Sequence, residues 1–442
     1  MTHARRKAAV AATFVISRLV VLSIEPPNST LAGVNVLYAF EMQRAAALGL
    51  PFYEMHARNV EEAAPNSTLD ERQVEYPPLA LVWMAMPTWF LEPIPKYGLV
   101  PDWQTEAAKR ASRIALFVVD LCGFGLLMYA GAGAAQLAVH TAAGVLLFPL
   151  LYERLDLVLG VLLLAALVML ARKLAAWAPL LALAVAINFK LTPLVLTPLF
   201  VMEKIGRRLA LLSALTAAVF LPFVAKDGVA TLGFLRYHAV RGLQLESVWS
   251  TIPVVQAALS GTPANVRERF GAFEVESGIS GALQVLASLA MAAAIPAFAV
   301  VLWKMPPREP RLYLRYAVAF LLAAIAVSKV FSPQYLLWLA PLVVLWDGRR
   351  ASVVWAAFLA TCALTTICYP FGYGRLLDAV NRAGQLPLAT RLAGVAPLAA
   401  RNLLLVGLTI WCWRDMAPAA QAGKIPGDAR RDARAARRTR AR

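Results

Sequence analysis

The fold of this protein is predicted most directly by the segment LDLVLGVLLLAALVMLARKLAAWAPLLALAVAINFKLTPLVLTPLFVME, residues 155–203. The segment contains three apolar runs, at 155–171, 174–189 and 191–203, separated only by Arg172-Lys173 and by Lys190. An α-helix needs roughly 20 apolar residues to cross a bilayer core. The runs therefore predict membrane helices, some of them short or broken, and they lack the alternation of a β-barrel strand.

The rest of the chain has the same apolar character. Of its 442 residues, 60% are hydrophobic and 16% are charged, whereas soluble domains average about 25% charged. A surface this apolar must face lipid, which excludes a soluble globular enzyme, a disordered chain and a disulfide-stapled secreted module. Further apolar runs lie at 8–24, 78–92, 113–131, 134–151, 209–225, 281–303, 316–331, 333–346, 352–369 and 391–413.

These runs predict one all-α polytopic membrane domain over residues 1–415, with about twelve transmembrane helices. Several runs carry prolines, which predicts broken or re-entrant helices where the backbone is buried or lines a cavity. The four cysteines lie in apolar runs without ligand spacing, so neither disulfides nor a metal site is predicted.

The distribution of Lys and Arg predicts the orientation of the chain. Arg5-Arg6-Lys7 and the basic tail at 416–442 predict that both termini lie in the cytoplasm. The Ala- and Arg-rich composition is typical of a bacterial protein, so the predicted location is the bacterial inner membrane. Three segments are predicted to lie outside: the long first loop at 25–77, then 226–280 and 370–390. For the remaining runs to alternate, 134–151 is predicted to be re-entrant or split.

The net charge of +17 follows largely from this topology. The tail at 416–442 is predicted to be disordered and to bind anionic phospholipid headgroups rather than nucleic acid.

Acidic side chains gather at the predicted outer face, whereas the spans themselves are nearly free of charge. Glu75 precedes Pro77-Pro78, which would hold it on a stiff entry to the next helix, unless it is only a solvated acid at a helix start. Glu153-Arg154-Leu155-Asp156 lies between two broken helices. There it would either line a site or form a structural ion pair.

Basic side chains gather at the same face, against the positive-inside bias. Arg236, His238 and Arg241 lie within six residues, and Lys190 and Lys329 each lie at a helix end near a proline. Guanidinium groups match phosphate oxygens in a bidentate way. The five residues predict a positive pocket for a lipid phosphate. The alternatives are a solvated turn and lysines that reach toward lipid headgroups.

Several of these motifs resemble one known family, glycosyltransferase family eighty-seven, a bacterial branch of the GT-C membrane glycosyltransferases. The similarity runs from about residue 18 to 341 and is most specific in Arg241–Ser247 and in Ser332-Pro333-Gln334-Tyr335. The matching segments are Gly49–Tyr53, Glu75–Leu79, Arg154–Leu157, Lys190–Pro193, Tyr237–Ser247 and Lys329–Leu336.

The resemblance implies a GT-C-like bundle with a site at its outer face. It also implies transfer of a sugar, typically mannose, from a polyprenyl-phosphate donor to a lipid-linked or polysaccharide acceptor. Such enzymes invert the donor linkage and need neither a metal nor another cofactor.

The general base of such enzymes is usually an Asp early in the first outer loop, where this chain has Asn35. Glu41 and Glu75 are the first candidates to replace it as the base, and Asp156 is the third. Lys190, Arg236, His238, Arg241 and Lys329 would bind the donor phosphate. The predicted sugar- and acceptor-binding residues are Asn35, Tyr38, Tyr76, Arg154, Gln244, Glu246, Gln334 and Tyr335.

Two other functions share the same cationic pocket. A flippase or transporter for a lipid carrier would bind the phosphate without needing a base, although alternating access favours a site at the midplane. A non-catalytic homologue in cell-envelope assembly would be consistent with Asn35.

Overall fold

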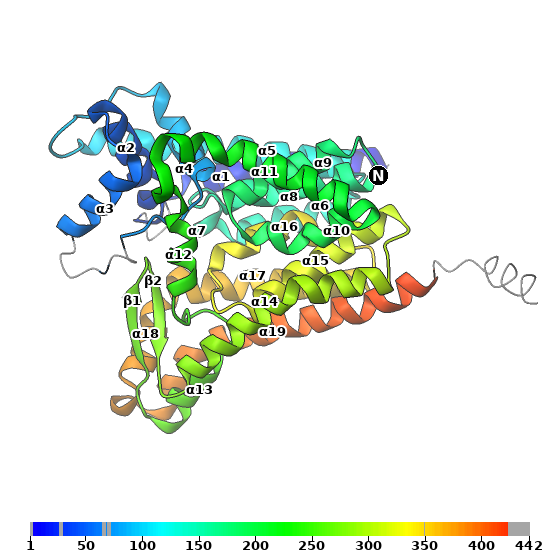
Figure 1. The fold of residues 1–442 in the computed structure, drawn as a ribbon. Coiled ribbons are helices and arrows are strands. Elements are labelled where there is room, and N and C mark those ends of the chain that lie inside the picture. The colour runs from blue at the N-terminus through cyan, green and yellow to red at the C-terminus, as the bar shows by residue number, and fades with distance from the viewer. Residues whose placement is uncertain (1–2, 26–29, 64–67, 69–71, 349, 423–442) are drawn as a thin grey trace, which may run out of the picture.

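The computed structural model describes residues 3–25, 30–63, 68, 72–348 and 350–422. Long helices run side by side along one direction, and shorter elements cover one end of the bundle (Figure 1). Six stretches are long and apolar enough to cross a membrane: Asp102–Tyr129, Thr192–Val240, Ser280–Lys304, Pro310–Val327, Ala351–Phe371 and Leu388–Met416. The chain is therefore a mostly helical, multi-pass membrane protein.

The first half of the chain contains these helices: α1 (His3–Ser23), α2 (Thr30–Leu48), α3 (Phe52–Ala63), α4 (Pro78–Ala85), η1 (Met86–Phe90), α5 (Asp102–Tyr129), α6 (Ala134–Leu146), α7 (Phe148–Leu151), α8 (Asp156–Ala171), α9 (Trp177–Phe189), η2 (Thr192–Leu196), α10 (Thr197–Val201), η3 (Met202–Lys204) and α11 (Ile205–Asp227).

The second half contains these elements: η4 (Gly228–Leu232), α12 (Gly233–Val240), α13 (Thr251–Ser260), β1 (Asn265–Arg269), β2 (Ala272–Glu276), α14 (Ser280–Lys304), α15 (Pro310–Val327), η5 (Pro333–Tyr335), α16 (Leu336–Val343), α17 (Ala351–Thr366), η6 (Ile367–Phe371), α18 (Tyr373–Asn381), η7 (Ala383–Gln385) and α19 (Leu388–Ala422).

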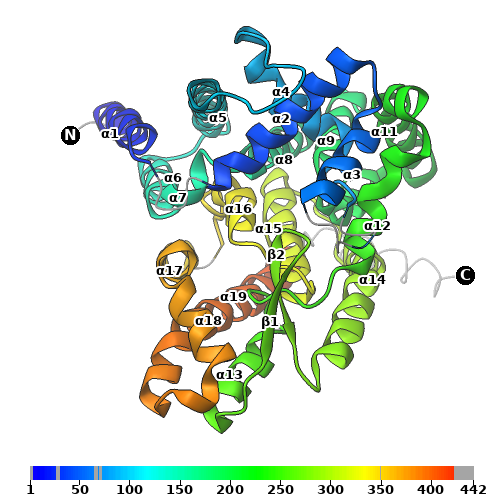
Figure 2. The same ribbon diagram turned by 90° about the vertical axis from the view of Figure 1, so that its left-hand side faces the viewer.

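The elements at the capped end come from the segments predicted to lie outside. Helices α2 and α3 belong to the first loop, and α12, α13, the β1–β2 hairpin and α18 come from the later two segments (Figures 1 and 2). The N-terminus and the far end of α19 lie at the opposite end of the bundle (Figure 1). This arrangement agrees with the predicted grouping of the loops. Their assignment to one side of a bacterial membrane stays a prediction.

The segment that fails to traverse the bundle is 78–92, and not 134–151 as predicted. The link between η1 and α5 stays at the capped end, where Arg44 Nε of α2 donates to the Pro95 carbonyl at 3.3 Å (Figure 1). Arg113 of α5 then donates to the carbonyl of Ile24, just after α1, at 2.6 Å. Helix α5 therefore begins at the capped end and runs away from it.

The two helices α6 and α7 return the chain to the capped end. They are split at Leu147, and Pro149 lies within α7, so the expectation of a split segment is confirmed. The other segment, Pro78–Phe90, has 13 helical residues, which at 1.5 Å each are too few for a bilayer core. Apolar content alone could not show that 134–151 traverses the bundle and that 78–92 does not.

Two breaks between helices place lysines at the capped end. Helix α9 ends at Phe189, Lys190 is extended (φ −162°, ψ 144°), and Pro193 opens the next helical turn. In the same way α15 ends at Val327, and η5 begins at Pro333. A proline lacks the N–H that continues a helix, so each break contains a short non-helical segment, and this segment carries a lysine.

Helix α19 continues to Ala422, so residues 416–422 of the tail predicted to be disordered are helical. The remainder of that tail, 423–442, lies outside the described residues.

The bundle interior is not free of charge, which corrects the expectation for the spans. Arg18 of α1 is fully buried and its Nε donates to Asp120 of α5 at 2.7 Å. The same guanidinium donates to the Thr141 carbonyl of α6 at 2.9 Å, and Tyr152 donates to Asp120 at 3.0 Å. This cluster joins three helices through polar contacts that lipid cannot replace.

Candidate active site at the capped end of the bundle

The first part of the site is a buried ion pair between two helix ends. Lys190 Nζ lies 2.9 Å from Asp156 Oδ1, at the start of α8, and Trp338 Nε1 of α16 donates to the same oxygen at 2.6 Å. The ammonium also lies 4.7 Å from the ring centre of Tyr335 and 5.0 Å from that of Trp338. Aromatic faces attract cations, so this pocket holds a positive charge in a largely apolar setting.

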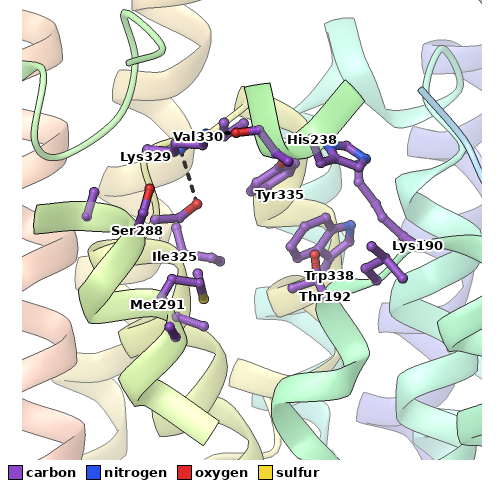
Figure 3. Close-up of a pocket in the computed structure, with 16 residues that line it drawn as sticks. Lys190, Thr192, His238, Ser288, Met291, Ile325, Lys329, Val330, Tyr335 and Trp338 are labelled. Atoms are coloured by element: carbon purple, nitrogen blue, oxygen red, sulfur yellow. Dashed lines mark hydrogen bonds between the residues drawn. The ribbon is translucent and has the colours of Figure 1, made fainter. Parts of the chain in front are cut away.

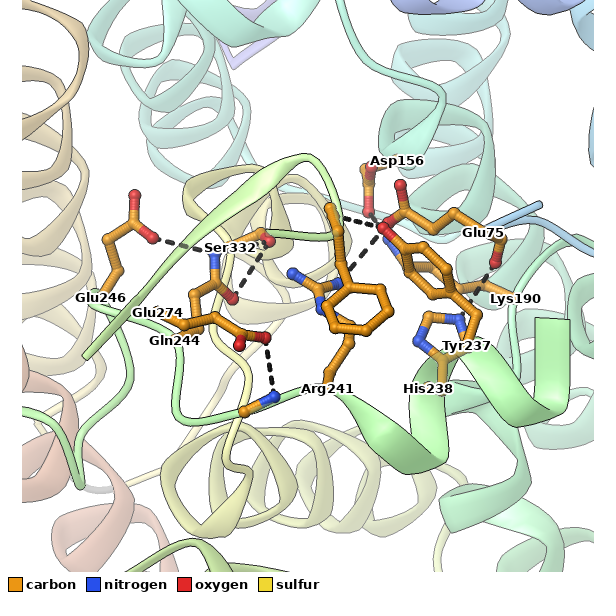
Figure 4. Close-up of polar contacts among 12 residues, drawn as sticks. Glu75, Asp156, Lys190, Tyr237, His238, Arg241, Gln244, Glu246, Glu274 and Ser332 are labelled. Carbon is orange, nitrogen blue, oxygen red and sulfur yellow. Dashed lines mark hydrogen bonds and ion pairs between the residues drawn. The ribbon is translucent and has the colours of Figure 1, made fainter. Parts of the chain in front are cut away.

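The second part of the site centres on Arg241, which follows α12. Its side chain is buried, and its Nη1 lies 3.9 Å from Glu75 Oε1 (Figure 4). The Arg241 Nε has no hydrogen-bond partner. A buried guanidinium with an unused donor is suited to bind an anion.

The backbone at Arg241 is fixed from several sides. Lys329 Nζ donates to the carbonyls of Arg241 and Ala239 at 2.6 and 2.9 Å, and Gln284 donates to the Arg241 carbonyl at 3.0 Å. Lys329 therefore holds the loop with two of its three N–H groups, in addition to any contact with a ligand. The sequence predicted phosphate binding for Lys329, with contact to lipid headgroups as the alternative, and not this role in holding the loop.

The residue after Arg241 is Gly242, whose backbone contacts the acid Glu274. Glu274 of β2 accepts a hydrogen bond from the Gly242 backbone N–H at 2.6 Å. A Cβ at Gly242 would lie 2.5 Å from Glu274 Oε2, so a larger residue here would require the Glu274 carboxylate to shift. Burial raises the pKa of Glu274, and the contact with the Gly242 N–H opposes that rise.

The loop after Gly242 pairs with β2 of the two-stranded hairpin through an isolated antiparallel bridge between Gln244 and Glu274. Leu245 N–H donates to the Phe273 carbonyl at 2.8 Å, and Val275 N–H donates to the Leu243 carbonyl at 2.9 Å. Gln244 between them donates to Glu246 at 2.8 Å and to Ser332 at 3.1 Å. Gln244 and Glu246 therefore belong to a buried network that joins two loops. Their predicted role in binding sugar or acceptor is untested.

One cavity of about 480 Å³ unites the basic residues at its upper end (Figure 3). Lys190, His238 and Lys329 lie there, and Tyr335 separates the first from the last. Below them in the view lie the apolar side chains of Met291 on α14, Ile325 on α15 and Trp338 on α16 (Figure 3), and Ala292 and Ala324 also line the cavity. The cavity is therefore cationic at one end and apolar along its length.

His238 lines this cavity in surroundings that disfavour its protonated form. Its Nε2 lies 3.1 Å from the Glu75 carbonyl. Burial lowers the pKa of His238 to about 4, helped by the cations of Arg241 and Lys190 and opposed by Glu75. The neutral ring donates from Nε2, which leaves Nδ1 as an acceptor. These surroundings disfavour the positive charge that was expected of His238, and its role as a phosphate ligand stays a prediction.

This pKa predicts a pH dependence of stability. The unfolded chain takes up a proton at His238 near pH 6.5, whereas the folded chain resists it until about pH 4. The stabilisation from neutral His238 is complete above pH 6.5 and is lost as the pH falls toward 4. We expect His238→Gln, whose amide replaces the Nε2 donor, to flatten the melting temperature between pH 6.5 and 4. Equal pH profiles for both proteins would contradict this.

The predicted acids have different surroundings. Glu41 is buried on α2, where it accepts from Asn59 at 3.0 Å and lies 2.8 Å from His56 Nδ1. Asp156 is the counter-ion of Lys190, as described above. The Glu75 side chain is 22% exposed, and among the described residues its ion-pair partner is Arg241.

Asn35 occupies the expected position of the base, but its side chain is an amide and makes a structural hydrogen bond. Its Nδ2 donates to the Glu153 carbonyl at 3.1 Å, and the side chain is buried. Tyr38, on the same helix, packs edge-on against Tyr76 with ring centres 6.0 Å apart. These two tyrosines connect α2 to Lys190, which lies 5.8 Å from the Tyr76 ring centre.

The remaining predicted residues divide into two groups. Tyr335 lines the cavity, Gln334 is buried beside it in η5, and Arg154 lies half-buried with an Nε that lacks a partner. Arg236 lies on an exposed face of α12 and does not line the cavity. Of the five residues predicted to bind phosphate, Lys190, His238 and Lys329 line this cavity, whereas Arg241 and Arg236 do not.

Sequence reasoning missed several residues that shape the site. Trp338 and Glu274 contact predicted residues directly, and His56 partners Glu41, but none carried a motif that would have marked it. Two further residues, Arg401 and Asn402, lie in an apolar helix far along the chain. Their charge or polarity within an apolar run was the one available signal.

No protein-family model matches the sequence, and no curated protein matches it. Among solved structures, the chain is similar to ArnT from Cupriavidus metallidurans, whose crystal structure has undecaprenyl phosphate bound. The two are 15% identical, the similarity covers 91% of this chain and 77% of that chain, and the TM-score is 0.42. The similarity is distant, so the functional assignment rests on the geometry described above.

Proposed function

We propose that this protein is an integral-membrane glycosyltransferase that takes a sugar from a polyprenyl-phosphate donor. Following the motif resemblance, the sugar is mannose, the acceptor is a lipid-linked or cell-envelope glycan, and the reaction is inverting and metal-independent. The observation that carries the proposal is the cavity whose upper end holds lysines and whose lower walls are apolar. A polyprenyl phosphate has the same division, with an anion at one end and a hydrocarbon chain behind it.

In the proposed reaction, the cations stabilise the leaving group. As the bond between the sugar and the phosphate oxygen breaks, negative charge grows on the phosphate. Lys190 and Lys329 line the cavity, and Arg241 Nε has an unused donor. Their buried surroundings strengthen the attraction, because the local dielectric constant is lower than that of water.

Glu75 is the acid best placed to act as general base. The carboxylates of Glu41 and Asp156 are each held by two hydrogen-bond or ion-pair contacts, whereas the Glu75 carboxylate is partly exposed and faces Arg241 across 3.9 Å. In the proposed step, Glu75 takes the proton of the acceptor hydroxyl while that oxygen bonds to the sugar. The polyprenyl phosphate then leaves with the electrons of the broken bond.

The role of the cations is tested at Arg241. We expect Arg241→Met to weaken binding of decaprenyl phosphate roughly 10- to 100-fold, the usual effect of losing charged hydrogen bonds. Folding should be maintained, because Lys329 and Gln284 hold the backbone of residue 241 and not its side chain. Binding is measured by titration of the lipid into nanodisc-embedded protein.

The control is Arg267→Met, an exposed arginine of β1 whose side chain is 62% exposed. Its binding should equal that of the unaltered protein. Equal weakening in both variants would mean that the effect reflects net charge and would contradict a specific phosphate site. Binding without any sugar transfer by the unaltered protein would instead favour the flippase.

A further inference from the structure

The long helix α19 carries two buried polar residues, Arg401 and Asn402, next to the site loops. Both side chains are almost fully buried. Arg401 Nη2 donates to the Glu246 carbonyl, and its Nε donates to Asn402 Oδ1 at 3.0 Å. Asn402 in turn donates to the Ser247 carbonyl at 3.0 Å and to Thr251 Oγ1 at 2.7 Å.

Arg401 also reaches the second site loop. Its guanidinium carbon lies 4.4 Å from the ring centre of Phe331, two residues after Lys329. Phe331 is fully buried, and the following Ser332 accepts a hydrogen bond from Gln244 of the 241–247 loop. One side chain from α19 therefore contacts both the loop that carries Arg241 and the loop that carries Lys329.

These contacts compensate a costly group. Burying an arginine is unfavourable unless hydrogen bonds or a charge partner offset the loss of water. Among the described residues Arg401 has no carboxylate within 4 Å, so the Glu246 carbonyl, Asn402 and the Phe331 face supply the compensation, while its Nη1 has no hydrogen-bond partner. Such a residue can orient the Glu246 carbonyl and the Asn402 amide, because its planar fork bonds only in fixed directions.

We propose that Arg401 and Asn402 are positioning residues that set the relative placement of the 241–247 and 329–335 loops, and thereby the spacing of the cations around the donor phosphate. The proposal rests on the proposed function for its substrate, and on the contacts above for its geometry. Neither residue touches the cavity. They act through Glu246, Ser247 and Phe331.

The test compares Arg401→Lys, Arg401→Met and Asn402→Leu with the unaltered protein in nanodiscs. Decaprenyl phosphate is the binding probe, and hydrogen exchange at 243–247 and 329–335 reports the order of the two loops. We expect Arg401→Met and Asn402→Leu to bind about tenfold more weakly, with faster exchange confined to these loops. Arg401→Lys keeps the charge but not the fork, so its binding should be intermediate.

The matched control is Arg414→Met, an exposed arginine of the same helix, which should change neither measurement. If Arg401→Met does not fold, Asn402→Leu and Arg401→Lys carry the test. Normal probe binding and normal exchange in folded variants would overturn the inference. If the unaltered protein does not bind the probe, the proposed function fails, while exchange in the two loops still decides whether the pair positions them.

Discussion

Replacing Glu75 with Gln is expected to lower the rate of sugar transfer by about 10²- to 10⁴-fold, the usual contribution of a general base. The amide has the size of the acid but cannot take the proton of the acceptor hydroxyl. The fold should be retained, because the Glu75 contact that joins it to α12 is made by its backbone carbonyl with His238. Transfer is measured with a labelled polyprenyl-phosphate sugar, and donor binding is measured separately.

The matched control is Glu41→Gln, which changes an acid of the same loop region that is already bonded to His56 and Asn59. We expect it to reduce stability more than the transfer rate. Donor binding by Glu75→Gln should stay near normal, since a base is not a phosphate ligand. A transfer rate in Glu75→Gln equal to that of the unaltered protein would show that Glu75 is not the base.

Replacing Arg18 with Met is expected to lower the free energy of unfolding by about 3–5 kcal/mol, the cost of leaving a buried partner charge unpaired. Arg18 and Asp120 are both buried, and the guanidinium also serves the Thr141 carbonyl. A Cβ at Gly144 would lie 2.2 Å from Arg18 Nη2, so the helices α1 and α6 leave little room for another arrangement. Unfolding is followed in detergent by denaturant titration.

The double variant Arg18→Met with Asp120→Asn provides the control. It removes both charges and leaves an amide that can still accept from Tyr152, so it should recover part of the lost stability. Donor binding by the folded fraction should be normal in both variants, because the cluster does not line the cavity. If the single variant is as stable as the unaltered protein, the ion pair does not hold α1 in the bundle.

The class of fold could be predicted from the sequence because hydrophobicity is a local property. Apolar runs such as 155–171 become helices wherever they lie in a membrane, and prolines such as Pro193 and Pro333 end or open helices by removing a backbone donor. Lys190 and Lys329 were therefore expected at helix ends. The structure places both of them there and next to one cavity.

The roles of individual side chains could not be predicted, because they depend on partners far apart in the chain. Asp156 and Glu75 are equally acidic in sequence, yet Lys190 and Trp338 hold the first and leave the second partly exposed. His238 was expected to be a cation, but its burial, with Arg241 nearby, lowers its pKa to about 4.

The sequence by itself determined that this is a helical membrane protein whose basic and acidic residues gather at the ends of its helices, since the cost of charge in lipid acts on each segment alone. Tertiary structure decided that segment 78–92 does not traverse the bundle and that the Glu75 carboxylate stays partly exposed. It also decided that Arg18 and Arg401 can lie inside the bundle. Each of these outcomes depends on a pairing energy, and a pairing exists only when the chain has brought both partners together.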